Sequence, residues 1–481
     1  MDILVKAAQL VLALVILVTV HEFGHYAFAR MFGVKVNRFY LFFNPWFSIL
    51  KWNPMKGTLE FLPHNSKDGG PDKAVHTWQV GKPRTPRADG KPTWRDTIYG
   101  LGWLPLGGYC DIAGMIDETK DASKLESEPQ SWEFRSKPAW QRLLVMVAGV
   151  LLNFVLAIAI YIGIAFHWGD SVIPYQAMSE GMDFSEEMKA AGFRDGDILM
   201  SIDGRPVDAK DYASGWDMIQ PGARVGVLRE GTETLVTVSD GLVKSMATKG
   251  KDYRPMSMRV PVVVAKLLPG EGAAEGGLAQ GDRILKVGND TTPAITEFMP
   301  ALQKAKGNKT PMLVRHADGS ETVMEVPVNE YGKIGIQMLS PMEIFDLETV
   351  RYSFLGAIPR GWDIGTTQLT TYVSSLGLIF SKEGAQSLGG FGTLGDLFPT
   401  HWSWYSFWQI TAFLSIILAF MNIIPIPGLD GGHTLFLLVE IVTRRKPSDR
   451  FLEIANTVGF AFLLLLLVYA NGNDIYRYFL K

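Results

Sequence analysis

The N-terminal segment of the chain contains the motif His21-Glu22-Phe23-Gly24-His25. Because residues four apart share one face of a helix, His21 and His25 can bind a single metal ion with Glu22 beside them, as in zinc hydrolases. The apolar run before the motif, Ile3 to Val20, is long enough to enter a bilayer, where ionisable residues are by default functional candidates. The alternative to a metal site is a pair of histidines that only form hydrogen bonds. This alternative is less favoured because each polar group would need a hydrogen-bond partner within the hydrocarbon layer. The motif predicts a zinc protease that cleaves peptide bonds within or beside the membrane.

Composition limits the function classes. The chain has 481 residues, of which 47% are hydrophobic, and a formal net charge of −3, so it gives no indication of nucleic-acid binding. Its single cysteine, Cys110, excludes an intrachain disulfide and has no zinc-ligand or nucleophile signature, so we interpret it as structural. No small-x-small cleavage site follows the apolar N-terminus, and we therefore expect a retained first span rather than a signal peptide.

Four segments have the length and apolar character of membrane spans. They cover residues 3–28, 140–166, 407–426 and 451–469. Asn153 interrupts the second span, and an aromatic cluster at 401–408 precedes the third, as is typical of a membrane interface.

Basic residues near the span ends predict the orientation. They are Arg30, Lys35, Arg38, Arg135, Lys137, Arg142, Arg444, Arg445, Lys446 and Arg450, whereas residues 167–188 contain no Lys or Arg. The positive-inside rule therefore places 31–137 and 428–450 in the cytoplasm and 168–400 outside, with both chain termini outside.

The expected exported segment contains a repeat. The pattern Gly-apolar-x-x-Gly-Asp at 192–197 recurs 85 residues later at 277–282, and each copy is followed by an apolar strand and a second turn. This resembles the core of a PDZ domain, and short alternating strands nearby agree with small β-rich domains. A generic β-turn that happens to repeat is the alternative.

The expected cytoplasmic segment combines strand-like pieces, 39–50 and 97–110, with an insertion at 51–93. The insertion is rich in Lys, Pro, Gly and Asp and should be an exposed loop, so we interpret its His64 and His76 as solvated. Gly107 and Gly108 would let another extended chain approach closely, and an unpaired strand edge there could bind an unfolded substrate by β-addition. Residues 345–385 should be helical and partly amphipathic, on the outer membrane surface.

A catalytic zinc site needs a third protein ligand. The third span ends in the segment Asn422 to His433, which contains Pro425, Pro427 and Asp430. Because the first and third spans run in the same direction, Asp430 should reach the depth of the two histidines. Prolines at membrane depth are tolerated where the backbone is buried or lines a cavity. The alternative is a simple turn with Asp430 capping the next helix. His433 is a competing ligand, for which we favour a supporting or structural role.

On these motifs the chain resembles the site-2 protease family of intramembrane zinc metalloproteases, specifically the bacterial RseP group with tandem PDZ domains. The motifs are His21 to His25, Leu106-Gly107-Gly108-Tyr109, and Asn422 to His433 with Leu429-Asp430-Gly431, and the likeness extends over all four spans and both repeats. Some details depart from the family. The second span reads Gly149-Val150-Leu151-Leu152-Asn153 without the usual proline, Phe42-Phe43-Asn44-Pro45 replaces a Gly-x-Gly hairpin, and Gly389-Gly390 replaces a Gly-Pro.

The resemblance implies roles for particular residues. The matches of the family's zinc ligands are His21, His25 and Asp430, and Glu22 matches the catalytic acid/base. Asn422, Pro425 and Pro427 would help receive a substrate helix as it unwinds, beside the strand edge of Gly107 and Gly108. Asn153 would be a supporting or structural residue. The implied substrates are single-span membrane proteins, namely anti-sigma factors and remnant signal peptides, with a site-1 protease acting upstream and the PDZ-like pair excluding bulky exported domains.

We therefore expect a multi-pass zinc metalloendopeptidase of the bacterial cytoplasmic (inner) membrane, with its active site near the cytoplasmic side. Its fold class would be a polytopic α-helical membrane protein with four spans, two exported β-rich PDZ-like domains and a membrane-associated β-hairpin or sheet. The expected divisions are spans at 1–30, 138–167, 401–430 and 451–473, cytoplasmic loops at 31–137 and 431–450, PDZ-like domains at 168–258 and 259–340, a membrane-surface helical segment at 341–400 and a tail at 474–481.

Two other function classes compete with a protease. A membrane-anchored PDZ scaffold with relic polar residues predicts the loss of at least one of His21, Glu22, His25 and Asp430, and all four are present. An ion-coupled transporter would use paired broken helices in repeated halves, and the chain shows no such symmetry.

Overall fold

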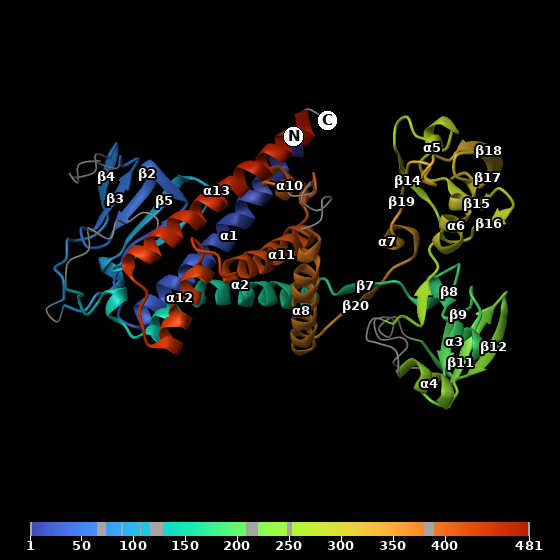
Figure 1. The fold of residues 1–481 in the computed structure, drawn as a ribbon, viewed down its shortest axis with the longest axis horizontal. Helices are drawn as coiled ribbons and strands as arrows, with labels where there is room; N and C mark the ends of the chain where they lie inside the picture. Colours follow the sequence, from blue (N-terminus) through green and yellow to red (C-terminus); the bar gives the residue numbers. More distant parts are fainter. Residues whose placement is uncertain are drawn as a thin grey trace. The chain divides into compact units, whose positions relative to one another are not determined.

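The computed structural model describes residues 2–64, 74–87, 90–105, 107–115, 128–207, 220–247, 253–379 and 389–479. Leu106 of the predicted glycine motif and parts of the 51–93 insertion lie outside these residues. The chain divides into two compact units (Figure 1). Residues 1–168 and 352–481 make up the membrane unit, and residues 169–351 make up the β-rich unit.

Among the described residues, seven α-helices of the membrane unit surround the site or hold the helices that do. They are α1 (Asp2–Met31), α2 (Ala139–His167), α8 (Phe354–Ile379), α10 (Phe391–Asp396), α11 (Trp404–Ile423), α12 (Asp430–Thr443) and α13 (Asp449–Phe479). In the part of the chain that the structure describes, four stretches, in α1, α2, α11 and residues 450–476 of α13, are long and apolar enough to cross a membrane, which confirms the prediction of a polytopic membrane protein.

Helix α2 is the centre of this bundle, because α1, α8, α11 and α12 all pack against it. Glycine permits the closest approach to α1. A Cβ atom on Gly24 would lie 2.5 Å from the Ala148 carbonyl oxygen, so the two backbones touch where the His-Glu-x-x-His motif lies. The buried Arg142 of α2 donates to Glu440 of α12 at 2.5 Å and ties these two helices together.

A six-stranded sheet lies beside the C-terminal part of α1, which contacts β1 and β6. Its strands are β1 (Val36–Leu41), β2 (Phe43–Asn53), β3 (Thr58–Phe61), β4 (His76–Gln79), β5 (Ile98–Leu104) and β6 (Tyr109–Ile112), in the order β4-β3-β2-β5-β1-β6. β1 runs parallel to β5 and antiparallel to β6, and β6 is the last strand of the sheet among the described residues.

Two expectations about loops were wrong. The 51–93 insertion contains β3 and β4. β2 continues to Asn53, the turn containing Gly57 (φ +67°) leads into its partner β3, and β4 pairs with β3. The 431–450 segment, expected to be a loop, contains most of α12. This helix is only 14 residues long, so its apolar pattern is too short to indicate a span.

The β-rich unit consists of two lobes, each with its own core. The first contains β7 (Asp170–Val172), β8 (Met182–Phe184), α3 (Glu186–Ala190), β9 (Ile198–Ile202), β10 (Arg205–Pro206), β11 (Arg224–Arg229), β12 (Thr232–Thr237), α4 (Asp240–Ala247), β13 (Met256–Met258), α7 (Pro341–Ile344) and β20 (Glu348–Val350). The second contains β14 (Val264–Leu267), α5 (Gly272–Glu275), β15 (Arg283–Val287), β16 (Asp290–Thr291), α6 (Ile295–Ala305), β17 (Lys309–Arg315), β18 (Glu321–Pro327) and β19 (Ile336–Met338).

The sequence repeat corresponds to a repeat in the structure. The four-stranded sheets have matching orders, β10-β9-β11-β12 and β16-β15-β17-β18, and each lobe has a further strand pair, β8–β13 or β14–β19. In the repeated turn the carboxylate of buried Asp197 accepts the Arg194 amide at 2.9 Å, and buried Asp282 accepts the Ala279 amide at 2.8 Å. The shared Gly-Asp pattern therefore forms a turn in which the aspartate carboxylate accepts the hydrogen bond of a backbone N–H group that would otherwise need water.

Candidate metal and catalytic site

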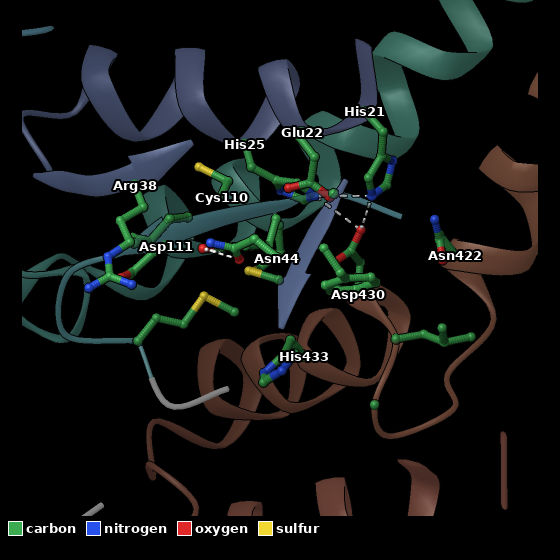
Figure 2. A pocket seen from close by; sticks show the side chains of 18 of the residues that line it. His21, Glu22, His25, Arg38, Asn44, Cys110, Asp111, Asn422, Asp430 and His433 are labelled. Carbon is green, nitrogen blue, oxygen red and sulfur yellow. Dashed lines mark hydrogen bonds and ion pairs between the residues drawn. The ribbon is translucent and has the colours of Figure 1, made fainter. Parts of the chain in front are cut away.

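Three side chains from opposite ends of the chain meet in the membrane unit (Figure 2). Asp430 Oδ2 lies 3.1 Å from His21 Nε2 and 3.2 Å from His25 Nε2, and the two Nε2 atoms are 3.3 Å apart. Within the part of the chain that the structure describes, this is the single cluster of three or more His, Cys, Asp or Glu side chains that could hold a metal ion. His64 and His76 are not part of it.

Local structure explains why Asp430 reaches the histidines. α11 ends at Ile423, and Pro425 and Pro427 prevent it from continuing as a regular helix. The chain then turns through Gly428 (φ +90°), with the Leu429 amide donating to the Ile426 carbonyl at 3.1 Å, and Asp430 begins α12. A carboxylate in the first turn of a helix is favoured by the helix dipole. The aspartate side chain then extends from this turn toward α1.

Neighbouring groups on α2 orient both imidazole rings. His25 Nδ1 lies 2.8 Å from the Val145 carbonyl oxygen, and this contact directs Nε2 toward Asp430. The side-chain amide of Asn153, which is fully buried, lies 3.3 Å from His21 Nδ1. The backbone carbonyl of Asn153 accepts a hydrogen bond from Ser415 Oγ of α11 at 2.7 Å. Gly149 lies against both rings, since a Cβ atom there would be 2.5 Å from His25 Nε2.

Glu22 lies in a cavity of about 780 Å³ next to the triad. The backbone amide of Cys110, on the edge strand β6, hydrogen-bonds the Glu22 carboxylate. Asn422 and His433 also line the cavity, and His433 is not part of the cluster of His21, His25 and Asp430. Gly108 lines the cavity as well, where a Cβ atom would lie 3.6 Å from Glu22 Cγ. Gly107, Pro425 and Pro427 are not among the residues that line the cavity.

Sequence reasoning missed a second polar group in the cavity wall. Asn44 is buried, donates to Ser48 Oγ at 3.0 Å and accepts the Tyr109 hydroxyl at 3.0 Å. Burial, followed by the neighbouring Tyr40, raises the pKa of Tyr109 to about 12, so this phenol is neutral at physiological pH. The one available signal was that Asn44-Pro45 stands where a glycine hairpin is usual.

The three-atom cluster fits zinc. Ligand atoms about 2.0–2.1 Å from a tetrahedral zinc ion are separated by roughly 3.3–3.4 Å, and the three separations here are 3.1–3.3 Å. Asp430 Oδ2 is buried and has no hydrogen-bond donor other than the two rings among the described residues. Two imidazoles and one carboxylate, with a cavity on the remaining side, are a combination of ligand types that catalytic zinc sites use.

Comparison with known proteins agrees with this geometry. The model of peptidase family M50 matches residues 9–71 and 90–466. A Neisseria meningitidis protein whose name describes a zinc metalloprotease is 26% identical over 97% of this chain and 98% of its own length. The protease RseP of Yersinia pestis is 27% identical and the regulator of sigma E protease of Haemophilus influenzae is 24% identical, each over 99% of this chain and 100% of its own length.

Proposed function

Since the chain belongs to peptidase family M50 and is an intramembrane zinc metalloprotease, we propose that His21, His25 and Asp430 hold its zinc ion and that Glu22 is its catalytic acid and base. The observation that carries this assignment is the near-equilateral triangle of His21 Nε2, His25 Nε2 and Asp430 Oδ2. When bound, zinc would acidify a water molecule and polarise the carbonyl of the peptide bond to be cleaved. Proton transfer, orientation of the histidine rings and binding of the substrate would be carried out by side chains and backbone groups of this protein.

Glu22 is placed to move protons. Its carboxylate lies beside the three ligands and is held by the Cys110 amide, so it faces the cavity that a substrate would enter. In the proposed reaction Glu22 takes a proton from the attacking water and returns one to the leaving amine nitrogen. The water oxygen bonds to the carbonyl carbon, and the carbon–nitrogen bond breaks to give an acid and an amine.

Asn153 would fix the tautomer of His21. A histidine that binds zinc through Nε2 carries its proton on Nδ1 and needs an acceptor there. Asn153 Oδ1 is buried and has no hydrogen-bond partner among the described residues, while the amide nitrogen of the same side chain lies beside His21 Nδ1. Turning this amide by half a rotation would place the oxygen next to Nδ1 and satisfy both atoms.

We place the substrate along strand β6. A helical peptide protects its carbonyl groups by internal hydrogen bonds, so it must unwind before cleavage, and an unpaired strand offers replacement bonds. β6 is the outermost strand of the sheet in the part of the chain that the structure describes, and it lines the cavity with Tyr109, Cys110 and Asp111. Gly107 and Gly108 would admit the extended chain next to Glu22. Asn422 would bind its backbone from the other wall, on a turn shaped by Pro425 and Pro427.

The proposed substrates are transmembrane segments of single-span proteins in the bacterial inner membrane. The name of the Haemophilus influenzae relative refers to regulation of sigma E, which supports anti-sigma factors as one class, and remnant signal peptides are the other. In this proposal the site faces the cytoplasmic side. The two lobes of the β-rich unit act as extracytoplasmic PDZ-like domains that exclude bulky substrates until a site-1 protease trims them.

Zinc content tests the ligand assignment. We expect purified wild-type protein to contain about one zinc per chain, and His25→Gln and Asp430→Asn to contain much less. The matched control is His76→Gln, the same substitution at an exposed histidine of β4, which should leave zinc content unchanged. Equal zinc in His25→Gln and His76→Gln would contradict the assignment.

In a strain without its own enzyme of this type, wild-type protein should clear single-span peptides that accumulate with Glu22→Gln.

A further inference from the structure

The contact between helix α13 and the turn that precedes Asp430 has a role that the motifs do not assign. Between residues 450 and 470 of α13, two positions are buried, Asn456 and Gly459, and the others are exposed or partly exposed. These two positions are three apart and therefore share one face of the helix. One narrow face of an otherwise lipid-compatible helix is thus committed to a protein contact.

Gly459 touches the turn directly. A Cβ atom on Gly459 would lie 1.7 Å from the Pro427 carbonyl oxygen and 2.4 Å from its carbonyl carbon. On the other side of the contact, a Cβ atom on Gly428 would lie 3.1 Å from the Phe460 amide nitrogen. The α13 backbone therefore packs against the backbone of the turn without any intervening side chain. A single methyl group on α13 could not be accommodated unless the helix or the turn moved.

The face of α13 that carries Gly459 also carries a buried polar side chain, Asn456. Its side chain is 4% exposed, and its Oδ1 atom has no hydrogen-bond partner among the described residues. A buried amide oxygen without a partner is unfavourable, and in a membrane helix such a residue is a functional candidate. The face that meets the turn therefore combines a glycine with an amide, whereas Leu463 to Leu467 follow immediately after it.

The turn would transmit a displacement to Asp430. Pro427 is three residues from Asp430, and this stretch is closed by hydrogen bonds from the Ile426 amide to Ile424 at 2.7 Å and from the Leu429 amide to Ile426 at 3.1 Å. Gly431 and Gly432 of α12 pack closely against this stretch, because Cβ atoms there would lie 2.1 Å from the Ile424 oxygen and 2.6 Å from the Ile426 oxygen, respectively. With no free space on the α12 side, the turn would shift as one body.

Helix α13 is anchored at a distance from this contact. Asp474, 5% exposed, accepts the Gly390 amide at 2.9 Å, the Thr393 amide at 3.1 Å and the Thr393 hydroxyl at 2.6 Å. Gly390 precedes α10, and α10 packs against α1, where Lys6 and Asp396 form an ion pair of 2.8 Å. The helix is thus fastened to the bundle about 22 Å along its axis from Gly459.

From these contacts we propose that α13, through Gly459, positions the Pro425–Gly428 turn and thereby sets the place of Asp430 in the metal site. Gly459 is a positioning residue, and the anchor at Asp474 holds α13 against the turn. This inference rests on the proposed function, because it assumes that Asp430 is a zinc ligand.

The test measures the rate at which full-length protein in lipid nanodiscs loses zinc to a chelator. The key variant is Gly459→Ala, and the matched control is Gly472→Ala, the same substitution in the same helix where an added Cβ atom meets nothing within 4 Å. Alanine favours a helix over glycine, so neither change should weaken α13 itself. We expect Gly459→Ala to lose zinc about tenfold faster than Gly472→Ala, and added zinc to restore its peptide cleavage.

Asp474→Asn is the second variant, which keeps the test decisive if Gly459→Ala does not fold. It should also accelerate zinc loss, although it lies far from the ligands, because it loosens the anchor of α13. Asp430→Asn separates the two hypotheses. If Asp430→Asn loses zinc while Gly459→Ala and Asp474→Asn behave like Gly472→Ala, the positioning role is wrong and the ligand assignment stands. If Asp430→Asn retains zinc like wild type, the ligand assignment itself fails.

Discussion

At the scale of single residues, the proposed division of labour separates metal binding from proton transfer. Glu22 touches the cavity and is not part of the three-atom cluster, so Glu22→Gln should keep zinc and lose hydrolysis by about 10²–10⁴-fold. Single-turnover cleavage of a fluorescent transmembrane peptide, normalised to zinc content, would measure this. Glu60→Gln, on strand β3, is the control and should cleave at the wild-type rate. Cleavage by Glu22→Gln near the wild-type rate would exclude Glu22 as the proton carrier.

Asn153 gives a second prediction at this scale. Replacing it with leucine removes the side-chain amide that lies beside His21 Nδ1, so zinc affinity should fall about 10–100-fold. Competition with a zinc-binding dye would give the affinity. Ser415→Ala removes a hydrogen bond to the backbone carbonyl of Asn153 and leaves its side chain in place, so it should change the affinity much less. Equal losses in the two variants would indicate that Asn153 acts through helix packing instead.

The residues of the site differed in how far the sequence could predict them. The positions of His21, Glu22 and His25 follow from helical spacing, and the position of Asp430 follows from the directions of two spans, so their approach could be anticipated. The Cys110 contact could not be, because it uses the backbone amide, which every residue type except proline carries. The pairing of Tyr109 with Asn44 likewise depends on the register of the sheet.

At the scale of secondary-structure elements, the crossing of α1 and α2 is the contact on which the site depends. Gly149→Ala would place a methyl group 2.5 Å from His25 Nε2, so the helices must separate or the ring must turn. We expect loss of zinc and a lower midpoint of thermal unfolding. Gly163→Ala is the matched control in α2, because nothing lies within 4 Å of its added Cβ atom. This control should be neutral or slightly stabilising, since alanine favours helix. If both variants bind zinc equally, the close crossing is not required.

Elements were predicted well where hydrophobicity alone decides them. The expected spans 140–166 and 3–28 differ by a few residues from Ala139–His167 and Asp2–Met31, because long apolar runs have few alternatives in a bilayer. Short elements were not predictable in this way. α12 begins with Asp-Gly-Gly, and β3 and β4 lie within a polar stretch whose strand character comes from pairing with β2. Their structure depends on tertiary neighbours.

At the scale of the whole molecule, the β-rich unit can be tested as a separable module. Its first and last strands pair with each other, with Asp170 opposite Val350 and Val172 opposite Glu348, so the chain enters and leaves the unit at one place. Among the described residues, the members of its two cores all come from this unit itself. Replacing residues 170–350 with a short Gly-Ser linker should therefore leave zinc content unchanged.

The same deletion separates catalysis from substrate selection. If the two lobes exclude bulky exported domains, the variant should cleave a short single-span peptide at the wild-type rate and should also cleave a substrate fused to a folded exported domain, which the wild-type protein should reject. The ratio of the two cleavage rates, measured in nanodiscs, reports selectivity independently of enzyme concentration. A deletion variant that retains zinc and still rejects the fused substrate would mean that selection occurs within the membrane unit, at the entrance to the cavity. In that case the lobes must serve another purpose than size exclusion.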